Sequence, residues 1–199
     1  MRHALLIFLM CSLTMPVLSG ELIEYHADKI DGYFVLHLDM RIKVNTRQVN
    51  SVLMDFDKMP EVDDTVVESR LIERAGDKHK IYFASEACVW IFCERIEQTA
   101  LVTEMGQGYI MSNTIVEESD LRYGRSLWRL IDEGNITRVI YNAEYIPDFW
   151  LPPLIGSSLA REKMLSEGLK TINGLERVIS RQKTARNSMS TPVGQRNNL

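Results

Sequence analysis

The 199-residue sequence has little glycine and proline and no internal repeat. It contains 11 Gly and 6 Pro, and no low-complexity tract interrupts it. Hydrophobic residues make up 45% of the chain and charged residues 25%, which is typical of a globular protein and excludes a fibrous or an intrinsically disordered one. A chain of this length predicts one domain with a sizeable core.

Basic charge is also scarce. The 23 Lys and Arg residues are outnumbered by 27 Asp and Glu residues, so the formal net charge is -4. An acidic chain of this kind lacks the electrostatic surface that nucleic acid requires, and we expect no nucleic-acid partner. The one basic segment, residues 181–186, precedes a polar C-terminal stretch that we expect to be solvated. Membrane contact through this charge is the alternative.

The residue patterns of common catalytic and metal centres are missing. The four His residues are scattered without a metal-ligand spacing, and no GxSxG motif is present. Three clustered carboxylates, Glu61, Asp63 and Asp64, have no His or Cys near them and predict a solvated acidic loop. We therefore expect no metal, no cofactor and no catalytic residues, which favours binding over enzyme activity.

No apolar run reaches the roughly 20 residues that a membrane-spanning helix needs. Arg2 and His3 precede the short apolar run Ala4–Met10, and a proline and small residues follow over Pro16–Gly20. This pattern is typical of a secretory signal peptide cleaved after Ser19 or Gly20. The mature protein is then expected to be periplasmic or secreted.

These patterns divide the chain into three parts. They are a signal peptide over residues 1–20, a folded domain over 21–182 and a disordered polar tail over 183–199.

The folded part begins with a strongly alternating segment. Phe34, Leu36, Leu38, Met40 and Ile42 alternate with residues that are mostly polar, which predicts a long strand with one buried face. A short amphipathic helix follows and ends before residue 60. Further strands with short connections predict an antiparallel meander, at residues 65–73, 78–87, 94–105, 109–117, 126–131 and 137–146.

A long amphipathic helix closes the domain. Pro152 and Pro153 suit its first turn, where a missing amide donor costs nothing. Its apolar side chains lie largely on one stripe and must cover the sheet. They are Leu159, Met164, Leu165, Leu169, Ile172, Leu175, Val178 and Ile179.

Two stretches carry a resemblance to a known family. The segment Phe56–Pro60, with the strand after it, resembles the same region of START-like proteins of the polyketide cyclase/dehydrase and coenzyme Q-binding branch (the SRPBCC superfamily). The stretch Gly124–Leu130, followed by Thr137–Tyr141, looks like the end of that family's sheet. The resemblance covers about residues 32–179. It implies an α+β helix-grip fold, in which a curved antiparallel sheet wraps around a long C-terminal helix.

A helix laid across a curved sheet leaves a cavity unless large side chains fill it. Residues on the expected inward faces are the candidates for its lining, with ordinary core packing as the alternative for each. They are Leu36, Leu38, Met40, Met111, Trp128, Leu130, Tyr141, Tyr145, Leu165 and Leu169. Each of the two tyrosines would bring a hydroxyl that either orients a polar ligand group or reaches solvent or backbone at the sheet edge.

Two cysteines enclose four residues, and two geometries are open to them. On one straight strand, Cys88 and Cys93 would lie on opposite faces and could not bond. In a hairpin they would face each other across its neck, and an oxidising compartment would favour a disulfide. The hairpin would leave Trp90, Ile91 and Phe92 at an apolar tip that guards a cavity mouth, contacts a membrane peripherally or folds back into the core.

The prediction is an exported binding protein for an apolar or amphipathic small molecule, such as a lipid, an isoprenoid or a quinone-like compound. The ligand would lie between the sheet and the C-terminal helix. An enzyme of the cyclase, dehydratase or hydrolase kind in the same cavity is the first alternative, and it would need an acid or base with a displaced pKa there. A ligand-free interaction module is the second.

Overall fold

The computed structural model describes residues 20–89, 92–148 and 157–189. In chain order their secondary structure is β1 (Glu21–Ile30), β2 (Tyr33–Ile42), α1 (Thr46–Leu53), η1 (Phe56–Lys58), α2 (Met59–Val62), β3 (Val66–Ala75), β4 (Lys78–Val89), β5 (Phe92–Gly106), β6 (Tyr109–Thr114), η2 (Val116–Glu118), β7 (Leu121–Asp132), β8 (Thr137–Pro147) and α3 (Ser157–Met189).

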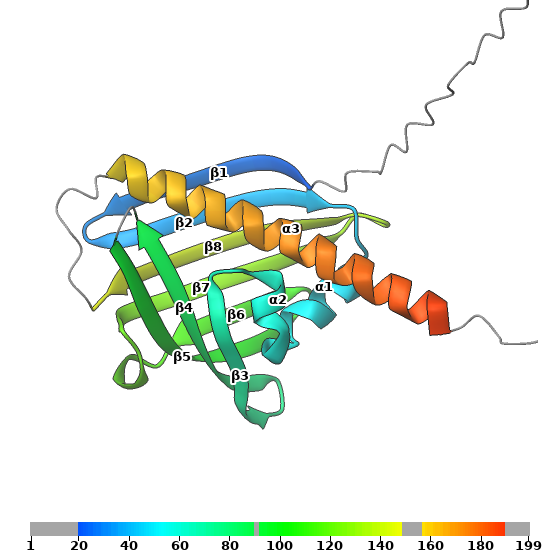
Figure 1. The fold of residues 1–199 in the computed structure, drawn as a ribbon, viewed down its shortest axis with the longest axis horizontal. Coiled ribbons are helices and arrows are strands. Elements are labelled where there is room, and N and C mark those ends of the chain that lie inside the picture. The colour runs from blue at the N-terminus through cyan, green and yellow to red at the C-terminus, as the bar shows by residue number, and fades with distance from the viewer. Residues whose placement is uncertain (1–19, 90–91, 149–156, 190–199) are drawn as a thin grey trace, which may run out of the picture.

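The strands form one antiparallel sheet in the order β1-β2-β8-β7-β6-β5-β4-β3. Only the step from β2 to β8 joins strands that are far apart in sequence, and the short helices α1 and α2 lie between β2 and β3 in the chain. The sheet curves from β1 at one edge to β3 at the other, and α3 lies across one face of it (Figure 1). This arrangement confirms the expected helix-grip α+β fold.

Helix α3 packs on β1, β2, α1 and α2 and makes the core with the sheet. On β2, Leu38, Met40 and Ile42 point to the face that carries α3, which we call the inner face. They pack in one cluster with Leu175 and Ile179 of α3, all almost completely buried. Each side chain of this kind contributes about 1.5–3 kcal/mol to folding. The alternation of β2 and the stripe on α3 therefore hold the two layers together.

A glycine sets how closely α3 approaches α2. A Cβ atom on Gly174 would lie 1.7 Å from the main-chain oxygen of Val62. Polar contacts join the same two elements, since Thr171 Oγ1 donates to Asp63 Oδ2 at 2.6 Å and Arg177 donates to the carbonyl oxygen of Glu61 at 2.9 Å. The position of α3 is thus fixed at its middle by contacts outside the sheet.

The structure differs from the sequence-based expectations in an additional first strand and in the length of the last helix. Strand β1 precedes the strand expected to be the first. Helix α3 continues to Met189, past the domain boundary expected at residue 182. Residues 1–19 of the expected signal peptide lie outside the described residues, as do Pro152 and Pro153, the prolines expected at the helix start. No helix in the described part of the chain is long and apolar enough to cross a membrane.

Candidate ligand-binding site

A cavity of about 280 Å³ lies against the sheet, over β4 to β8. Most of its lining side chains project from the inner face, because they alternate along each strand with residues of the opposite face. The lining residues are Phe83, Ser85, Ile96, Gln98, Ser112, Leu121, Gly124, Arg125, Ser126, Tyr141, Ala143, Glu144 and Tyr145. The cavity thus occupies the part of the inner face beside the buried core.

Aromatic ring pairs hold the two tyrosines that line this cavity. Trp128 of β7 pairs with Tyr141 of β8 across the sheet, and their ring centroids are 4.3 Å apart. Tyr145 stacks on Phe34 of β2 at 5.4 Å with nearly parallel rings. Both contacts fix the orientation of a tyrosine that lines the cavity, so the two phenol groups are held in place before any ligand arrives.

The cavity environment raises the pKa of both phenols, although both tyrosines are only partly buried. Desolvation raises the pKa of Tyr141 to about 12, although a hydrogen bond with Ser126 acts in the opposite direction. Desolvation also raises the pKa of Tyr145 to about 12, and the neighbouring Tyr141 adds to this rise. At neutral pH both side chains are uncharged hydroxyl groups that can donate a hydrogen bond.

Neutral hydrogen-bonding groups line the cavity on β4, β5 and β6. Within the described residues, the hydroxyls of Ser85 and Ser112 make no side-chain hydrogen bond. Gln98 donates from Nε2 to Thr114 Oγ1, which leaves its amide oxygen as an acceptor. Gly124 makes this contact sterically feasible, since a Cβ atom there would lie 2.1 Å from Thr114 Oγ1. The cavity therefore offers donors and acceptors but no charge from these residues.

The two charged residues in the lining belong to the other face of the sheet. Arg125 directs its guanidinium to the sulfur of Met111, 3.6 Å away, at an exposed position. Glu144 pairs with Arg125 in register across β7 and β8, so both side chains leave the sheet on the face away from α3. Within the described residues, the inner-face lining of the cavity therefore carries no ionic side chain.

The structure brings some of the predicted lining residues together and separates others. Tyr141 and Tyr145 line the cavity, and Trp128 contacts the ring of Tyr141 without being part of the lining. Met111 does not share their face, because its register partner on β7 is Leu127 while Ile110 pairs with Trp128. The other predicted residues pack in or against the core or lie half-buried on α3: Leu36, Leu38, Met40, Leu130, Leu165 and Leu169.

Several lining residues were not predicted, because they are small or polar. Ser85, Gln98, Ser112 and Ser126 all point to the inner face, yet a serine or glutamine in a strand is usually read as facing solvent. Alternation along the strand identifies them, because every second residue points to the same face. Ser85 lies two residues after Phe83 and four after Ile81, and both of these point inward. The cavity part of the inner face therefore carries polar side chains, in contrast to the apolar core.

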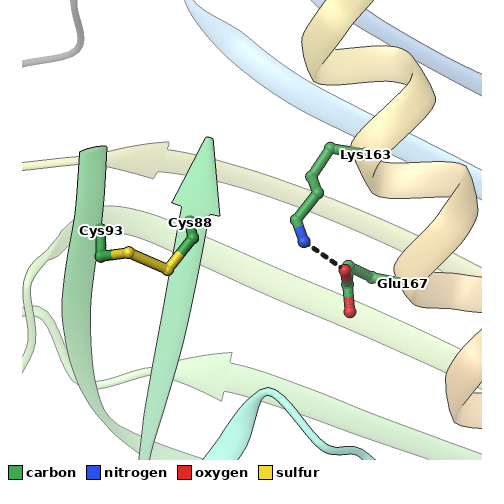
Figure 2. Close-up of a disulfide and its surroundings, with 4 residues drawn as sticks. All are labelled: Cys88, Cys93, Lys163 and Glu167. Carbon is green, nitrogen blue, oxygen red and sulfur yellow. Dashed lines mark ion pairs between the residues drawn. A yellow bond between two sulfur atoms is a disulfide. The ribbon is translucent and has the colours of Figure 1, made fainter. Parts of the chain in front are cut away.

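Of the two geometries open to the cysteines, the structure has the hairpin with its disulfide. Cys88 at the end of β4 and Cys93 at the start of β5 are register partners, and their sulfurs are bonded at 2.08 Å (Figure 2). The bond lies three residues beyond the cavity-lining pair Ser85 and Ile96. Trp90 and Ile91, and the side chain of Phe92, lie outside the described residues, so the apolar tip stays a prediction.

Helix α3 presents an ion pair beside the hairpin. Lys163 Nζ lies 2.5 Å from Glu167 Oε1, and both side chains extend from α3 toward the disulfide in Figure 2. Glu167 also lies close to Asp63 and Asp64, an arrangement whose oxygens could hold a cation. Lys170 contacts Glu167 at 3.3 Å and Asp64 at 3.7 Å, so lysine ammonium groups already balance this acidic cluster.

A second hollow of about 360 Å³ lies at the other end of the sheet, beside the first turn of α1. Its lining includes the predicted residue Leu130, together with Glu104, whose carboxylate lies 3.3 Å from Nε2 of the buried His79. The remaining lining is polar or glycine apart from the ring of Tyr109. The first cavity, with its aromatic wall, is better suited to an apolar ligand.

A curved antiparallel sheet wrapped around a long C-terminal helix is the helix-grip architecture. The cavity lies on the inner face of this sheet, and its described lining comes from β4 to β8 rather than from α3. Solved structures with this arrangement identify it as the START-like fold. The chain matches a START superfamily protein from Mycobacterium smegmatis with a TM-score of 0.59 at 12% identity, over 74% of this chain and 98% of that one. No family model matches the sequence, and no curated protein matches it.

Two further structures of this fold have names that describe a role. The STAR-related lipid transfer protein from Xanthomonas axonopodis matches with a TM-score of 0.57 at 16% identity, over 78% of this chain and 98% of that one. The Zhui aromatase/cyclase from Streptomyces sp. R1128 matches with a TM-score of 0.60 at 11% identity, over 77% and 98%. These likenesses show the fold of the chain.

Proposed function

We propose that this chain is an exported binding protein that holds an apolar or amphipathic small molecule, such as an isoprenoid or a quinone-like compound, against the inner face of its sheet. The observation that carries the proposal is the cavity of about 280 Å³ whose wall is formed by the fixed rings of Tyr141 and Tyr145. Its size is close to the lower end of the roughly 300–1,000 Å³ that is typical of small-molecule sites.

The lining combines apolar surface with a few polar groups, which is the usual composition of such sites. Phe83, Ile96 and Leu121 supply apolar contacts beside the two tyrosine rings. Burying apolar ligand surface against them contributes about 25 cal/mol per Å² before the cost of immobilising the ligand. The similar folds of a lipid transfer protein and an aromatase/cyclase support a ligand of this general kind for the present chain.

Export is supported by two independent features. The N-terminal pattern of Arg2, His3 and the short apolar run is typical of a signal peptide. The Cys88–Cys93 disulfide suits an oxidising compartment, since disulfides are rare in the reducing cytosol.

Binding fits the cavity better than catalysis does. The titratable inner-face groups in its described lining are the phenols of Tyr141 and Tyr145, each with a pKa of about 12. A general acid or base works best with a pKa near the operating pH, and these phenols are far from it. The cyclase, dehydratase or hydrolase alternative would therefore need a group from elsewhere.

Filling the cavity tests the proposal. Ser85→Leu places an isobutyl group into the cavity from β4, whereas Glu86→Leu places the same group on the opposite face from the next residue. We expect the wild-type protein and Glu86→Leu to bind the uncharged fluorophore N-phenyl-1-naphthylamine with enhanced emission, and Ser85→Leu to bind it at least tenfold more weakly. Equal binding by all three proteins would show that the fluorophore does not enter this cavity, and would contradict the proposal.

A further inference from the structure

The polar groups of the cavity specify the ligand more closely than its size does. On β6 and β7, Ser112 and Ser126 are register partners on the inner face, and the amide oxygen of Gln98 lies in the same lining. The hydroxyl of Ser112 makes no hydrogen bond with another described residue, while that of Ser126 meets Tyr141. Tyr145 supplies a protonated phenol on the neighbouring strand. These groups can donate to and accept from a ligand oxygen.

Among the described residues, no charged side chain of the inner face lines this cavity and could neutralise a charged ligand. Arg125 and Glu144 project to the other face, where Arg125 contacts Met111. Lys163 of α3, which extends toward the disulfide hairpin in Figure 2, is already paired with Glu167 at 2.5 Å. An ionised carboxylate or phosphate that entered the cavity would lose hydration and gain no counter-charge from these described residues, which is unfavourable.

We infer that the ligand is an uncharged molecule about the size of two fused rings that carries hydroxyl or carbonyl oxygens, and that the site rejects free carboxylates and phosphate head groups. This inference rests on the proposed function and narrows it. A cavity of about 280 Å³ is too small to enclose a lipid with two long acyl chains. An oxygenated ring compound can satisfy the free hydroxyl of Ser112 and the oxygen of Gln98 while its rings contact Tyr141 and Tyr145.

Three probes of matched shape test the inference by equilibrium dialysis against the purified exported protein at pH 7. The probes are 2-naphthol, 2-methylnaphthalene and 2-naphthoate, which place a hydroxyl, a methyl and an ionised carboxylate on the same ring. We expect 2-naphthol to bind at least tenfold more tightly than 2-naphthoate. We also expect Ser112→Ala to weaken 2-naphthol by about two- to tenfold, as the loss of one neutral hydrogen bond predicts, and to leave 2-methylnaphthalene within twofold.

A variant on the other face serves as the control. Thr103 is the register partner of Met111, and Thr103→Val removes a hydroxyl there without touching the cavity. It should leave all three affinities unchanged. If 2-naphthoate binds as tightly as 2-naphthol, or if Ser112→Ala weakens the methyl and hydroxyl probes equally, the inference fails while the proposed function stands. If none of the three probes binds, both fail.

Discussion

Replacing Gly174 by alanine has two opposite effects on stability: it raises the helix propensity of α3 and disrupts the packing of α3 on α2. Alanine is the better helix former, by about 1 kcal/mol, so an isolated helix would gain stability from the change. In the folded protein the new Cβ would lie 1.7 Å from the main-chain oxygen of Val62, whereas real Cβ atoms essentially never come within 3.0 Å of such an atom. Because the obstacle is backbone, α3 and α2 must separate by more than an ångström.

The cost of separating α3 from α2 exceeds the gain in helix propensity. Overpacking of a tight contact costs about 1–3 kcal/mol, and we place this one at the upper end because no side chain can rotate away. The movement also strains the hydrogen bond from Thr171 to Asp63 and the one from Arg177 to the carbonyl oxygen of Glu61. After the gain in helix propensity, we expect a net loss of about 2 kcal/mol in the free energy of unfolding.

Urea unfolding followed by circular dichroism measures this loss. With a typical slope of about 2 kcal/mol per molar urea, the midpoint of Gly174→Ala should fall by about 1 M. The exposed neighbour Asn173 provides the matched control, since Asn173→Ala improves propensity without meeting α2 and should leave stability equal or slightly higher. A Gly174→Ala protein as stable as wild type would refute the close packing of α3 on α2.

Three further predictions concern the disulfide and the buried titratable groups. Replacing Cys88 and Cys93 together by serine should lower the free energy of unfolding by about 2 kcal/mol, the loop-closure value for a separation of five residues, and reducing the wild-type protein should give the same loss in urea unfolding. Burial raises the pKa of Glu176 above 4.5, so the stability of the wild type should fall as pH rises through the raised value; Glu176→Gln should lack this fall and be the more stable protein at pH 8 in thermal unfolding scans. Because the pKa values of Tyr141 and Tyr145 are about 12, ultraviolet titration should find two tyrosines that remain un-ionised at pH 10.5, and their titration with the others would contradict the burial.

Periodic segments were predictable because they are buried on one side. The alternation around Leu38 and Met40 predicts a strand, and the stripe that includes Leu175 and Ile179 predicts a long helix, since in each case the core selects one face. Strand β1 carries no such signal. It lies at the edge of the sheet, where most of its residues are exposed on both faces, and so no apolar alternation marks it.

The cavity was harder to predict than the core because its lining breaks the apolar pattern. Ser85 and Ser112 occupy inward positions that a closed core would fill with large apolar side chains, and from sequence alone their polarity suggests the opposite face. Met111 shows the other difficulty, since the face of a residue depends on the register of its strand and a shift of one position reverses it. The pairing of Cys88 and Cys93 was easier to predict, because a tight hairpin places the two residues opposite each other.

The most direct test of ligand binding is native mass spectrometry, with organic extraction, of the mature protein purified from the periplasm of an expressing host. We expect a reproducible co-purifying molecule of low mass that is uncharged and oxygen-bearing, and that is lost from Ser85→Leu but retained by Glu86→Leu. A clean ligand-free mass for the wild-type protein, with no uptake from a panel of isoprenoids, quinones and other oxygenated ring compounds, would contradict it.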